Sequence, residues 1–375
     1  MNILYLHNTS EISGGERSLL ALWENLDRAR SQCFLAVPSD GALTEKARAL
    51  GVECVVWAAP ALRPWNAAGI LAAKRALERL VTEKGISLIH SYSPRNNILA
   101  ALAGRQAGTP VIWHERNLVY GREWDISAML AGLPDAIICN SKAVARRFER
   151  GGQIPSRVEV VYNGVNTEHF RPADAGEARQ RLGLPAAGKL VGVVSNLNRR
   201  KKVEAFLKAA SLLVRKDPSV SLVVVGGAFG ADQGDRLREL KETAARLGLA
   251  DRVVFAGFQD DVRPWLAAMD VYCAVTRREA CSRALLEAMA MGKPCVALRD
   301  GGNPELVADG VAGILTEPGD EAALSRALEQ LLDPAGPGHA YGQAARVCVE
   351  QSFTVQAQAA KTQDVYSRLT GRMKI

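Results

Sequence analysis

The sequence predicts an α/β protein made of two doubly wound domains, each a parallel sheet with helices on both faces. Three observations support this fold class. The 375 residues exceed what one hydrophobic core usually organises. Short apolar runs alternate with amphipathic stretches, as strands and helices do around a parallel sheet. The alternation breaks once, in the polar stretch with Pro and Gly between Asn166 and Lys189, which is typical of an interdomain linker.

The expected elements alternate along both halves of the chain, and a further helical region is expected between residues 115 and 135. In the first half, the expected strands span residues 2–7, 31–38, 52–58, 87–93, 110–115, 135–141 and 158–164. The helices between them span 15–26, 43–51, 67–84, 96–108 and 142–150. In the second half, the expected strands span 189–197, 221–227, 252–258, 271–276 and 294–299. The corresponding helices span 204–217, 236–248, 262–270, 280–292 and 319–333.

These elements define the expected domains. An N-terminal domain spans residues 1–170, a linker 171–187 and a C-terminal domain 188–350. A Pro- and Gly-rich break, "DPAGPGHAYG", then precedes a C-terminal helix within 351–375, and one arrangement packs that helix back on the first domain. Because ligands of such sheets bind beyond the carboxyl ends of the strands, we expect the two domains to face each other across a cleft.

Composition narrows the classes of function. The net charge of +7 suits anionic partners such as phosphates and nucleotides. Nucleic acid is not an expected partner, because no basic run exceeds residues 199–202 and only 6% of residues are aromatic. The seven cysteines form no CxxC pair, which argues against zinc and disulfides and favours the reducing cytoplasm. Neither a signal peptide nor a membrane span is expected, which leaves open a peripheral contact with the inner face of the membrane.

The stretch "REACSRALLEAMAMGKP", residues 278–294, holds Glu279 and Glu287, the second within an apolar segment. A buried carboxylate requires hydrogen bonds or a counterion. For Glu287, one interpretation is an ion pair with Arg283 on a solvated helix face, and the other is a carboxylate that binds the vicinal diol of a ribose. For Glu279, the alternatives are favourable charge at a helix N-terminus and a carboxylate at a strand end that faces a ligand.

A second motif, "NLNRRKKVEAF", places four adjacent cations between an expected strand and the helix after it. One interpretation is a solvated basic loop. The other is an anion site, because the loop follows the first strand of a doubly wound domain. No metal site is expected, since no DxD-like motif stands in a supporting context.

These two motifs together resemble the donor site of the retaining glycosyltransferases of family 4, which have the GT-B fold. That family has two glutamates with seven residues between them, then Ala-Met-Ala, a Gly and a Pro, as Glu279, Glu287, Gly292 and Pro294 stand here. The resemblance implies that Glu279 contacts hydroxyls of the donor sugar and that Glu287 contacts the nucleotide ribose. The helix start is expected to meet the diphosphate with its backbone, and the donor-site candidates there are Ser282, Arg283, Ala284 and Leu286.

The chain departs from the family pattern at two places. The family often has Gly-Phe-Gly after the first glutamate, where this chain has Ala280-Cys281-Ser282, so its choice of sugar could differ. In the basic loop, Lys201 matches the family lysine that neutralises the leaving diphosphate, a large catalytic contribution. Asn196 stands at the position of the family arginine and Lys202 where glycine is common, so the arginine role could have passed to a neighbour, and the candidates are Arg199 and Arg200.

Looser matches extend the resemblance over nearly the whole chain. Gly15, in the Gly-Gly-x-Arg form that ends at Arg17, is expected to let the backbone approach the donor phosphate or the acceptor. His114 falls where the family has a histidine that faces the donor sugar, and His90 is taken as architectural or as an acceptor contact. The loop that holds the base is expected near Phe258 and Gln259, and the glycine loop at 301–302 is expected to line the donor site.

The resemblance implies a retaining, metal-independent hexosyltransferase that uses a UDP- or GDP-sugar and no further cofactor. The acceptor is expected to be a glycan, a lipid-linked molecule or a small molecule, as in the synthesis of cell-surface polysaccharides or glycolipids. The N-terminal domain would bind the acceptor and the C-terminal domain the nucleotide sugar. Alternatives are a sugar-nucleotide epimerase or hydrolase on the same fold and a nonenzymatic nucleotide-binding protein. An oxidoreductase is not favoured, because no GxGxxG follows the first strand.

The stretch 57–81 has two interpretations. Trp57, Leu62 and Trp65 look exposed and lie among cations, which is typical of a surface that contacts a membrane. An ordinary amphipathic helix against the sheet explains the same pattern. The cations in question are Arg63, Lys74, Arg75 and Arg79.

Overall fold

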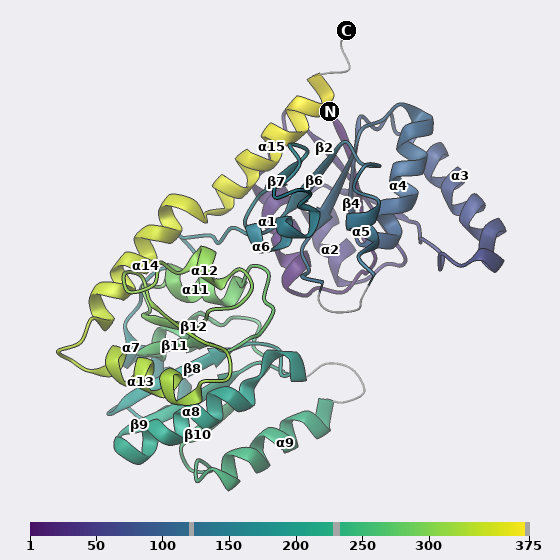
Figure 1. Cartoon of the computed structure of the whole chain (residues 1–375). Coiled ribbons are helices and arrows are strands. Elements are labelled where there is room, and N and C mark those ends of the chain that lie inside the picture. The colour runs from purple at the N-terminus through teal and green to yellow at the C-terminus, as the bar shows by residue number, and fades with distance from the viewer. Residues whose placement is uncertain (120–123, 228–232, 372–375) are drawn as a thin grey trace. The chain divides into compact units, whose positions relative to one another are not determined.

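The computed structural model describes residues 1–119, 124–227 and 233–371, and the chain divides into two compact units (Figure 1). Unit 1 comprises Met1–Gly164 and Val355–Ile375, and unit 2 comprises Val165–Thr354. Each unit has one parallel sheet with helices on both faces. The predicted α/β class, with two doubly wound domains, is therefore confirmed.

Unit 1 is built on a seven-stranded sheet of order β3-β2-β1-β4-β5-β6-β7, and every adjacent pair in it is parallel. The chain starts in the middle and changes direction between β1 and β4, which makes the carboxyl ends of these two strands the expected place for a ligand. The strands are β1 (Asn2–Leu6), β2 (Gln32–Val37), β3 (Glu53–Val56), β4 (Leu88–Tyr92), β5 (Val111–Glu115), β6 (Ala136–Cys139) and β7 (Val158–Val160).

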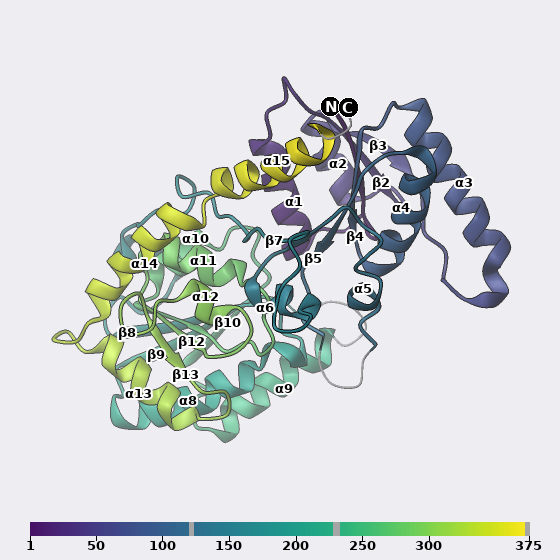
Figure 2. The ribbon, with the colours of Figure 1, turned by 45° about the horizontal axis from the view of Figure 1, so that its top comes forward.

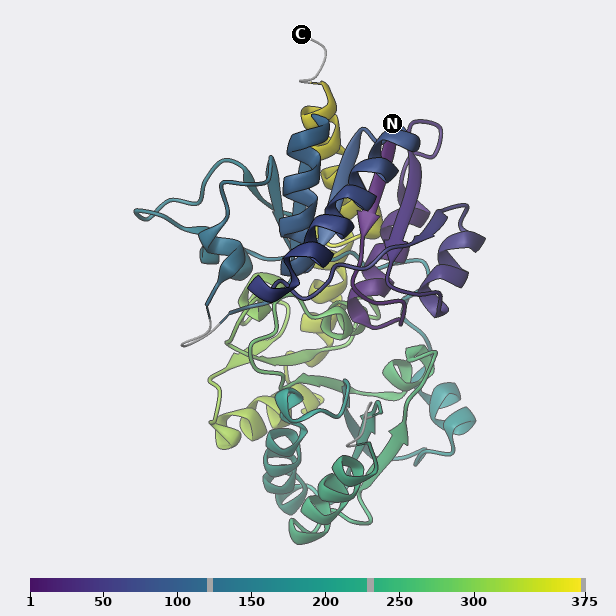
Figure 3. The ribbon, with the colours of Figure 1, turned by 90° about the vertical axis from the view of Figure 1, so that its right-hand side faces the viewer.

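Helices cover both faces of this sheet. α15 packs beside α1 on one face (Figure 2), and α3 packs beside α4 on the other (Figure 3). The core between α1, α15 and the sheet contains Tyr5, Trp23 and Tyr366, each fully buried. The helices are α1 (Gly14–Asn25), α2 (Ala42–Ala49), α3 (Ala67–Glu83), α4 (Pro94–Ala107), α5 (Ile126–Met129), α6 (Lys142–Ala145) and α15 (Val355–Gly371), with 3-10 turns η1 (Pro64–Asn66) and η2 (Arg146–Phe148).

Unit 2 has a six-stranded parallel sheet of order β10-β9-β8-β11-β12-β13. Its chain changes direction between β8 and β11, so the same rule places a ligand beyond these two strands. The strands are β8 (Lys189–Val194), β9 (Val220–Val225), β10 (Val253–Gly257), β11 (Val271–Ala274), β12 (Cys295–Leu298) and β13 (Ile314–Thr316).

The core of unit 2 lies between this sheet and its helices, where Val193, Phe206, Leu222 and Leu328 are buried together. The helices are α7 (Ala175–Leu182), α8 (Val203–Lys216), α9 (Gln233–Arg246), α10 (Arg263–Ala268), α11 (Arg283–Ala290), α12 (Asn303–Leu306), α13 (Glu321–Leu332) and α14 (Gly338–Ser352), with the 3-10 turn η3 (Arg199–Lys201).

The predicted break "DPAGPGHAYG" is wrong in its second half, where α14 already begins at Gly338. The reason is close packing rather than chain flexibility. A Cβ at Gly342 would lie 2.3 Å from the carbonyl oxygen of Gly292, so the glycine lets α14 approach the end of α11. β13 was not among the expected strands either.

The expected exposure of Trp57 is also wrong. Its side chain is buried, and its indole N–H donates to the carbonyl of Ala73 at 3.1 Å, inside α3. Trp65, by contrast, is 79% exposed and lies under the guanidinium of Arg63. In the part of the chain that the structure describes, no helix combines the length and apolarity needed to cross a membrane.

Candidate active site

The loops after β8 and β11 meet at the point where the sheet of unit 2 changes direction. Lys201 comes from the first loop and Glu279 from the second, and Lys201 Nζ lies 2.6 Å from Glu279 Oε2. Both side chains are about one-quarter exposed, at 24% and 22%. The structure thus brings together two residues that lie 78 positions apart in the sequence, at the edge where a doubly wound sheet binds its ligand.

The position of Glu279 depends on the glycine loop after β12. The N–H of Gly302 donates to the carbonyl of Glu279 at 2.8 Å. Gly301 has a φ of +60°, and a Cβ there would lie 2.2 Å from the same carbonyl oxygen. No larger residue fits this approach without moving the backbone of Glu279, which gives the predicted glycine loop a physical role.

Lys201 closes the short turn η3, where its N–H donates to the carbonyl of Asn198 at 3.0 Å. The next residue, Lys202, is the N-cap of α8 and has a φ of +52°. This left-handed conformation favours glycine, which accounts for the glycine that the resembling family commonly has here. Among the other candidates on this loop, Asn196 and Arg200 are exposed. Arg199 is also exposed and forms an ion pair with Glu239 on α9.

Glu287 lies on α11 and is buried, with its side chain 12% exposed. The guanidinium of Arg283, one turn earlier, donates to it at 3.1 Å. The ion pair considered from the sequence is therefore present, on a mostly buried face of the helix. A carboxylate offers about four lone-pair directions, so one bond to Arg283 leaves capacity for the hydroxyls of a diol.

The start of α11 shows what the departure from Gly-Phe-Gly does. Ser282 is the N-cap, and its hydroxyl accepts from the N–H of Leu285 at 3.3 Å. The N–H groups of Arg283 and Ala284 have no protein partner among the described residues and lie at the positive end of the helix dipole. Leu286 is fully buried and its N–H donates to the Ser282 carbonyl, so it supports the helix from the core side.

The loop after β10 carries the two residues expected near the base. Phe258 is 53% exposed, an unusual state for so large an apolar side chain. Gln259 is half-buried, and its amide donates to the carbonyl of Ala256 at 2.7 Å. The end of β9 lies beside this loop, because the N–H of Gly226 donates to the carbonyl of Gly257 at 2.8 Å. The loop after β8 joins them, since the N–H of Leu197 donates to the carbonyl of Gly227 at 3.0 Å.

His114, in unit 1, is the second-to-last residue of β5 and belongs to a buried cluster of rings. Its Nδ1 lies 3.0 Å from Nε2 of His90, and Nδ1 of His90 lies 2.6 Å from the hydroxyl of Tyr366 on α15. Tyr92 stacks on both histidines. Burial lowers the pKa of His90 to about 3, with a further contribution from Arg116. Burial likewise lowers the pKa of His114 well below its usual value, so both rings are neutral near pH 7.

Gly15 lies in the first turn of α1, where the guanidinium of Arg116 donates to its carbonyl at 2.6 Å. A Cβ at Gly15 would lie 2.5 Å from that guanidinium. The open space expected above this glycine is thus taken by an arginine of the same unit. Arg116 also lies over the ring of Tyr92 at 5.0 Å.

Sequence reasoning missed the polar residues around Arg116. His7 directly follows β1, and its Nε2 lies 3.3 Å from Glu16 Oε1. Burial lowers the pKa of His7 to about 4, although Glu16 acts in the opposite direction. Glu16 also closes a capping box with Ser13. The capping spacing was a usable signal, whereas the isolated His7 gave none.

A second missed network surrounds Glu115, next to His114. Its carboxylate is buried and accepts from Asn97 at 2.9 Å, from Ser127 at 2.8 Å and from Arg147 at 2.8 Å. Arg147 also forms a bidentate ion pair with Asp125, in which its Nε and one terminal nitrogen donate to the two carboxylate oxygens. In residues 1–119, 124–227 and 233–371, no three His, Cys, Asp or Glu side chains gather as metal ligands would.

Comparisons with known proteins agree with this geometry. The profile described as Glycosyl transferases group 1 matches residues 188–334, and that of Glycosyltransferase Family 4 matches residues 12–169. D-inositol 3-phosphate glycosyltransferase 2 of Catenulispora acidiphila is 32% identical over 303 residues, which cover 75% of this chain and 70% of that protein. The solved structure of HepE from Anabaena in complex with UDP is 25% identical, with a TM-score of 0.87 over 98% of this chain and 100% of that one. HepE has also been solved with UDP-glucose, with a TM-score of 0.84.

Proposed function

This chain belongs to the glycosyltransferases of family 4, and from that premise we propose that it moves a hexose-type sugar from a UDP-sugar to an acceptor hydroxyl with retention of configuration. The observation that carries this proposal is the contact of Lys201 with Glu279 at the point where the sheet of unit 2 changes direction. UDP is the proposed nucleotide because the similar HepE was solved with UDP and with UDP-glucose.

Each group in unit 2 has a part in the proposed reaction. The ammonium of Lys201 and the free N–H groups of Arg283 and Ala284 stabilise the charge that develops on the leaving diphosphate. Arg200, exposed and one residue away, is a further candidate for this task. Glu279 accepts hydrogen bonds from hydroxyls of the donor sugar. Its ion pair with Lys201 is then exchanged for contacts with the donor.

Retention follows if the acceptor attacks on the face that the diphosphate leaves. The acceptor oxygen forms the new bond to the anomeric carbon while the bond from that carbon to the diphosphate oxygen breaks. The acceptor proton passes to the departing phosphate oxygen, which carries the electron pair of the broken bond. No protein nucleophile and no metal are required in this scheme, in which positioning and charge stabilisation provide the catalysis.

The other donor contacts are proposed from the family resemblance. Glu287 binds the ribose diol, while Phe258 and Gln259 lie along the uracil. Asn196 and Arg199 belong to the loop beside the diphosphate. Ser282 caps α11 with its side chain where the family often has glycine, so the sugar meets a hydroxyl there rather than an open backbone. From unit 1, His114 is the proposed contact with the donor sugar, and Gly15 marks the proposed place of the phosphate, which would be met through the guanidinium of Arg116 that covers this glycine.

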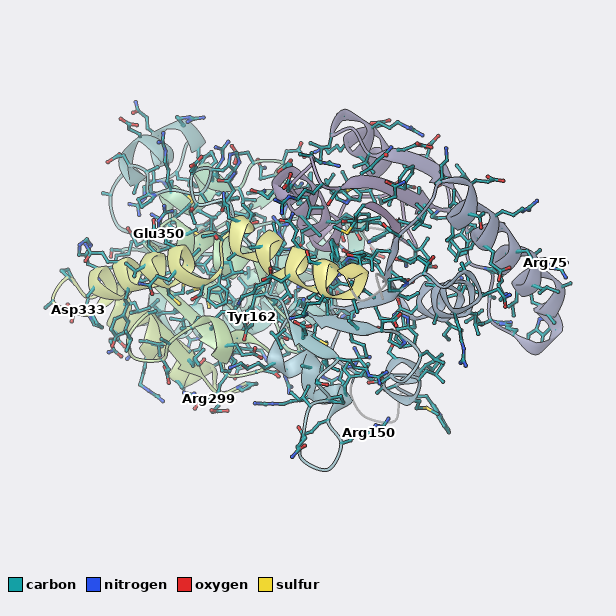
Figure 4. The ribbon with its side chains drawn as sticks, turned by 90° about the horizontal axis from the view of Figure 1, so that it is seen from above. Arg75, Arg150, Tyr162, Arg299, Asp333 and Glu350 are labelled. Carbon is teal, nitrogen blue, oxygen red and sulfur yellow. The ribbon has the colours of Figure 1, made fainter. Side chains whose placement is uncertain are left out.

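The acceptor is proposed to bind unit 1, in the synthesis of a cell-surface polysaccharide or glycolipid at the cytoplasmic face of the membrane. The proposed surface for membrane contact comprises η1, where Trp65 is exposed, and the middle of α3, where Arg75 is exposed (Figure 4). Reversal of the charge of Arg75 together with Lys74 should reduce flotation with anionic liposomes. Unchanged flotation of this double variant would remove the membrane contact and leave the transferase proposal intact.

A donor screen tests the proposed function. Thermal unfolding would be followed with UDP, GDP and their sugars, because a ligand that binds the native state raises the melting temperature. We expect UDP and one UDP-sugar to stabilise the chain, and Glu279→Ala to remove the preference for the sugar nucleotide over UDP. Absence of a shift with every nucleotide would contradict the proposal. Rapid loss of the donor without any acceptor, equal with and without EDTA, would instead favour the hydrolase alternative.

A further inference from the structure

A hydrogen-bonded network of four side chains, Tyr5, Tyr366, His90 and His114, runs through the core of unit 1 toward the carboxyl edge of its sheet. The hydroxyl of Tyr366 on α15 lies 3.2 Å from the hydroxyl of Tyr5 and 2.6 Å from Nδ1 of His90. The Nε2 of His90 lies 3.0 Å from Nδ1 of His114. Because His90 uses both of its ring nitrogens, it connects the last helix of the chain to the histidine near the edge of the sheet.

The order of the strands places these side chains on one face of the sheet. His90 pairs with Ile112 of β5, and His114 follows two residues later, so both imidazoles point to the same side. Tyr5 of β1 pairs with His90 and lies on that side as well. α15 covers this face beside α1 (Figure 2). Tyr366 therefore reaches His90 although the two residues are 276 positions apart in the sequence.

Burial leaves only one end of the network near solvent. Tyr5, Tyr366 and His90 are fully buried, whereas His114 keeps 7% of its surface exposed. Tyr92 stacks on both imidazoles, with ring centres 4.8 Å and 4.7 Å from its own, and the planes of the two imidazoles differ by only 13°. This stacking fixes both rings, so a proton between them has a defined donor and a defined acceptor.

The position of one proton in the network determines the position of the next. Both histidines are neutral near pH 7, because burial lowers their pKa values. A neutral imidazole has one N–H and one bare nitrogen, so each ring donates on one side and accepts on the other. If donation runs from Tyr366 through His90, His114 carries its proton on Nε2. If donation runs in the opposite direction, His114 carries it on Nδ1.

The contact between Tyr366 and His90 favours the first direction. Its 2.6 Å lies in the range of about 2.5–3.0 Å in which hydroxyl groups donate, and it is shorter than the usual N–H···O separation of about 2.9 Å. A phenol is also a stronger acid than a neutral imidazole N–H, and an imidazole nitrogen accepts better than a phenol oxygen. Tyr366 therefore donates to Nδ1 of His90, and the Nε2–H of His90 donates to Nδ1 of His114.

We propose that Tyr366 and His90 fix the proton of His114 on Nε2 and so make His114 a hydrogen-bond donor to a ligand oxygen at the carboxyl edge of unit 1. Tyr366 and His90 are positioning residues, since both are fully buried. With Nδ1 occupied by His90 and Nε2 protonated, His114 has no nitrogen left to act as a general base. The inference rests on the proposed function only in taking the ligand oxygen to belong to the transferred sugar.

Nitrogen NMR of the full chain labelled with ¹⁵N-histidine tests the positions of the protons. The protonated and the bare nitrogen of a neutral imidazole resonate in separate ranges, and couplings to the ring hydrogens distinguish Nδ1 from Nε2. His90→Gln and His114→Gln assign the signals by their loss. At pH 7 we expect a protonated Nε2 and a bare Nδ1 in both His90 and His114. A proton on Nδ1 of His114 would overturn the proposal.

Two matched variants test whether Tyr366 directs the protons. Tyr366→Phe and Tyr5→Phe each remove one hydroxyl from the same core, so their effects on stability should be similar. Only Tyr366→Phe removes the donor to Nδ1 of His90, and a fraction of His114 should then carry its proton on Nδ1. Tyr5→Phe should leave the protons of both histidines in place. Unchanged proton positions in Tyr366→Phe, or the same change in both variants, would contradict the proposal.

Calorimetric titration separates this inference from the proposed function. Tyr366→Phe should bind UDP-glucose about two- to tenfold more weakly than Tyr5→Phe, the usual worth of one hydrogen bond, and both variants should bind UDP alike. An equal affinity of the two variants for UDP-glucose would remove the role of Tyr366 in binding the sugar. If the parent chain binds no nucleotide, the proposed function fails, while the nitrogen signals still report the proton of His114. If nucleotides bind and His114 carries its proton on Nδ1, the inference alone is wrong.

Discussion

The carboxyl edges of the two sheets share one topology and differ in their electrostatics. In unit 2 the edge carries Lys201 and Glu279, a charged pair that stays partly in contact with water. In unit 1 it carries His7, His90 and His114, three buried imidazoles that we call the neutral edge, beside the ion pair of Glu16 with Arg116. The doubly wound sheet thus determines where a ligand binds. The side chains at its edge determine whether the ligand is met by charged groups or by neutral hydrogen-bonding groups.

The difference has a physical cause. Burial disfavours the charged form of an imidazole, which is why the pKa values of His7 and His90 fall to about 4 and about 3. The exposed part of the Lys201–Glu279 pair avoids this desolvation, so its charges remain available to a diphosphate. The following predictions test whether this division between a charged edge and a neutral edge is real.

The largest effect is expected at the charged edge. Lys201→Ala should lower kcat about 10²–10³-fold, the usual loss when a donor to transition-state charge is removed. Lys201→Arg should recover part of the activity, since it keeps the charge. The matched control is Lys216→Ala, at the far end of α8, which removes an ion pair with Glu329 and should leave kcat unchanged. Equal losses in both alanine variants would indicate a structural effect on α8 rather than a role in catalysis.

The neutral edge predicts a loss of stability in acid. Unfolded histidines bind protons near pH 6.5, while folded His7 and His90 bind them only near pH 4 and pH 3. The unfolded state therefore holds more protons as the pH falls from 6 to 5, and the free energy of unfolding should drop by about 1 kcal/mol for each of these histidines. Urea unfolding at both pH values, followed by a probe in unit 1, measures this change.

Matched histidine variants isolate this effect from other titrating groups. His90→Gln should remove about a third of the acid-induced loss if His7, His90 and His114 contribute alike. His7→Gln should have a similar effect, because burial lowers the pKa of both histidines. If neither variant changes the slope relative to the parent chain, the histidines of unit 1 are protonated in the folded state and the neutral edge does not exist.

The two edges also differ in how far the sequence predicts their residues. Strand and helix alternation identified both sheets, because parallel strands that are buried on both faces read as nearly continuous apolar runs. At the charged edge, Glu279, Glu287 and Lys201 stand in spaced motifs that can be found without coordinates. At the neutral edge, His7 and Arg116 come together only through the order of β1, β4 and β5, so no local pattern marks them.

The errors have a common physical origin in tertiary packing. Gly338 and Gly342 looked like a break in the chain, but they are the small residues that let α14 approach its neighbours. Trp57 looked exposed among polar residues, yet it fills the space beneath α3. In each case the local preference was correct for a solvated chain and was overruled by a contact distant in sequence.

A smaller effect is expected at Glu287. Glu287→Gln keeps the shape of the side chain but removes the negative charge to which Arg283 and the ribose hydroxyls donate hydrogen bonds. The affinity for UDP should therefore fall about tenfold. Calorimetric titration with UDP and with uracil separates the two partners, because uracil lacks the ribose and should bind both proteins alike. Glu329→Gln, an exposed carboxylate on α13, is the control. An unchanged affinity for UDP would leave Glu287 as the partner of Arg283 alone.

The smallest effect concerns the turn that holds Lys201 at the charged edge. Lys202 adopts a φ of +52°, which costs a non-glycine residue about 1–2 kcal/mol, while glycine there costs the folded state about 0.5–1 kcal/mol in chain entropy. Lys202→Gly should therefore raise the free energy of unfolding by about 0.5 kcal/mol. Lys208→Gly, inside α8, should lower it by about 1 kcal/mol, since the helix interior has no such strain. Urea unfolding of both variants decides the sign. If Lys202→Gly is more stable and its kcat stays near that of the parent chain, Lys201 is the catalytic cation and Lys202 serves only the turn. A large loss of kcat would instead mean that both lysines contact the diphosphate.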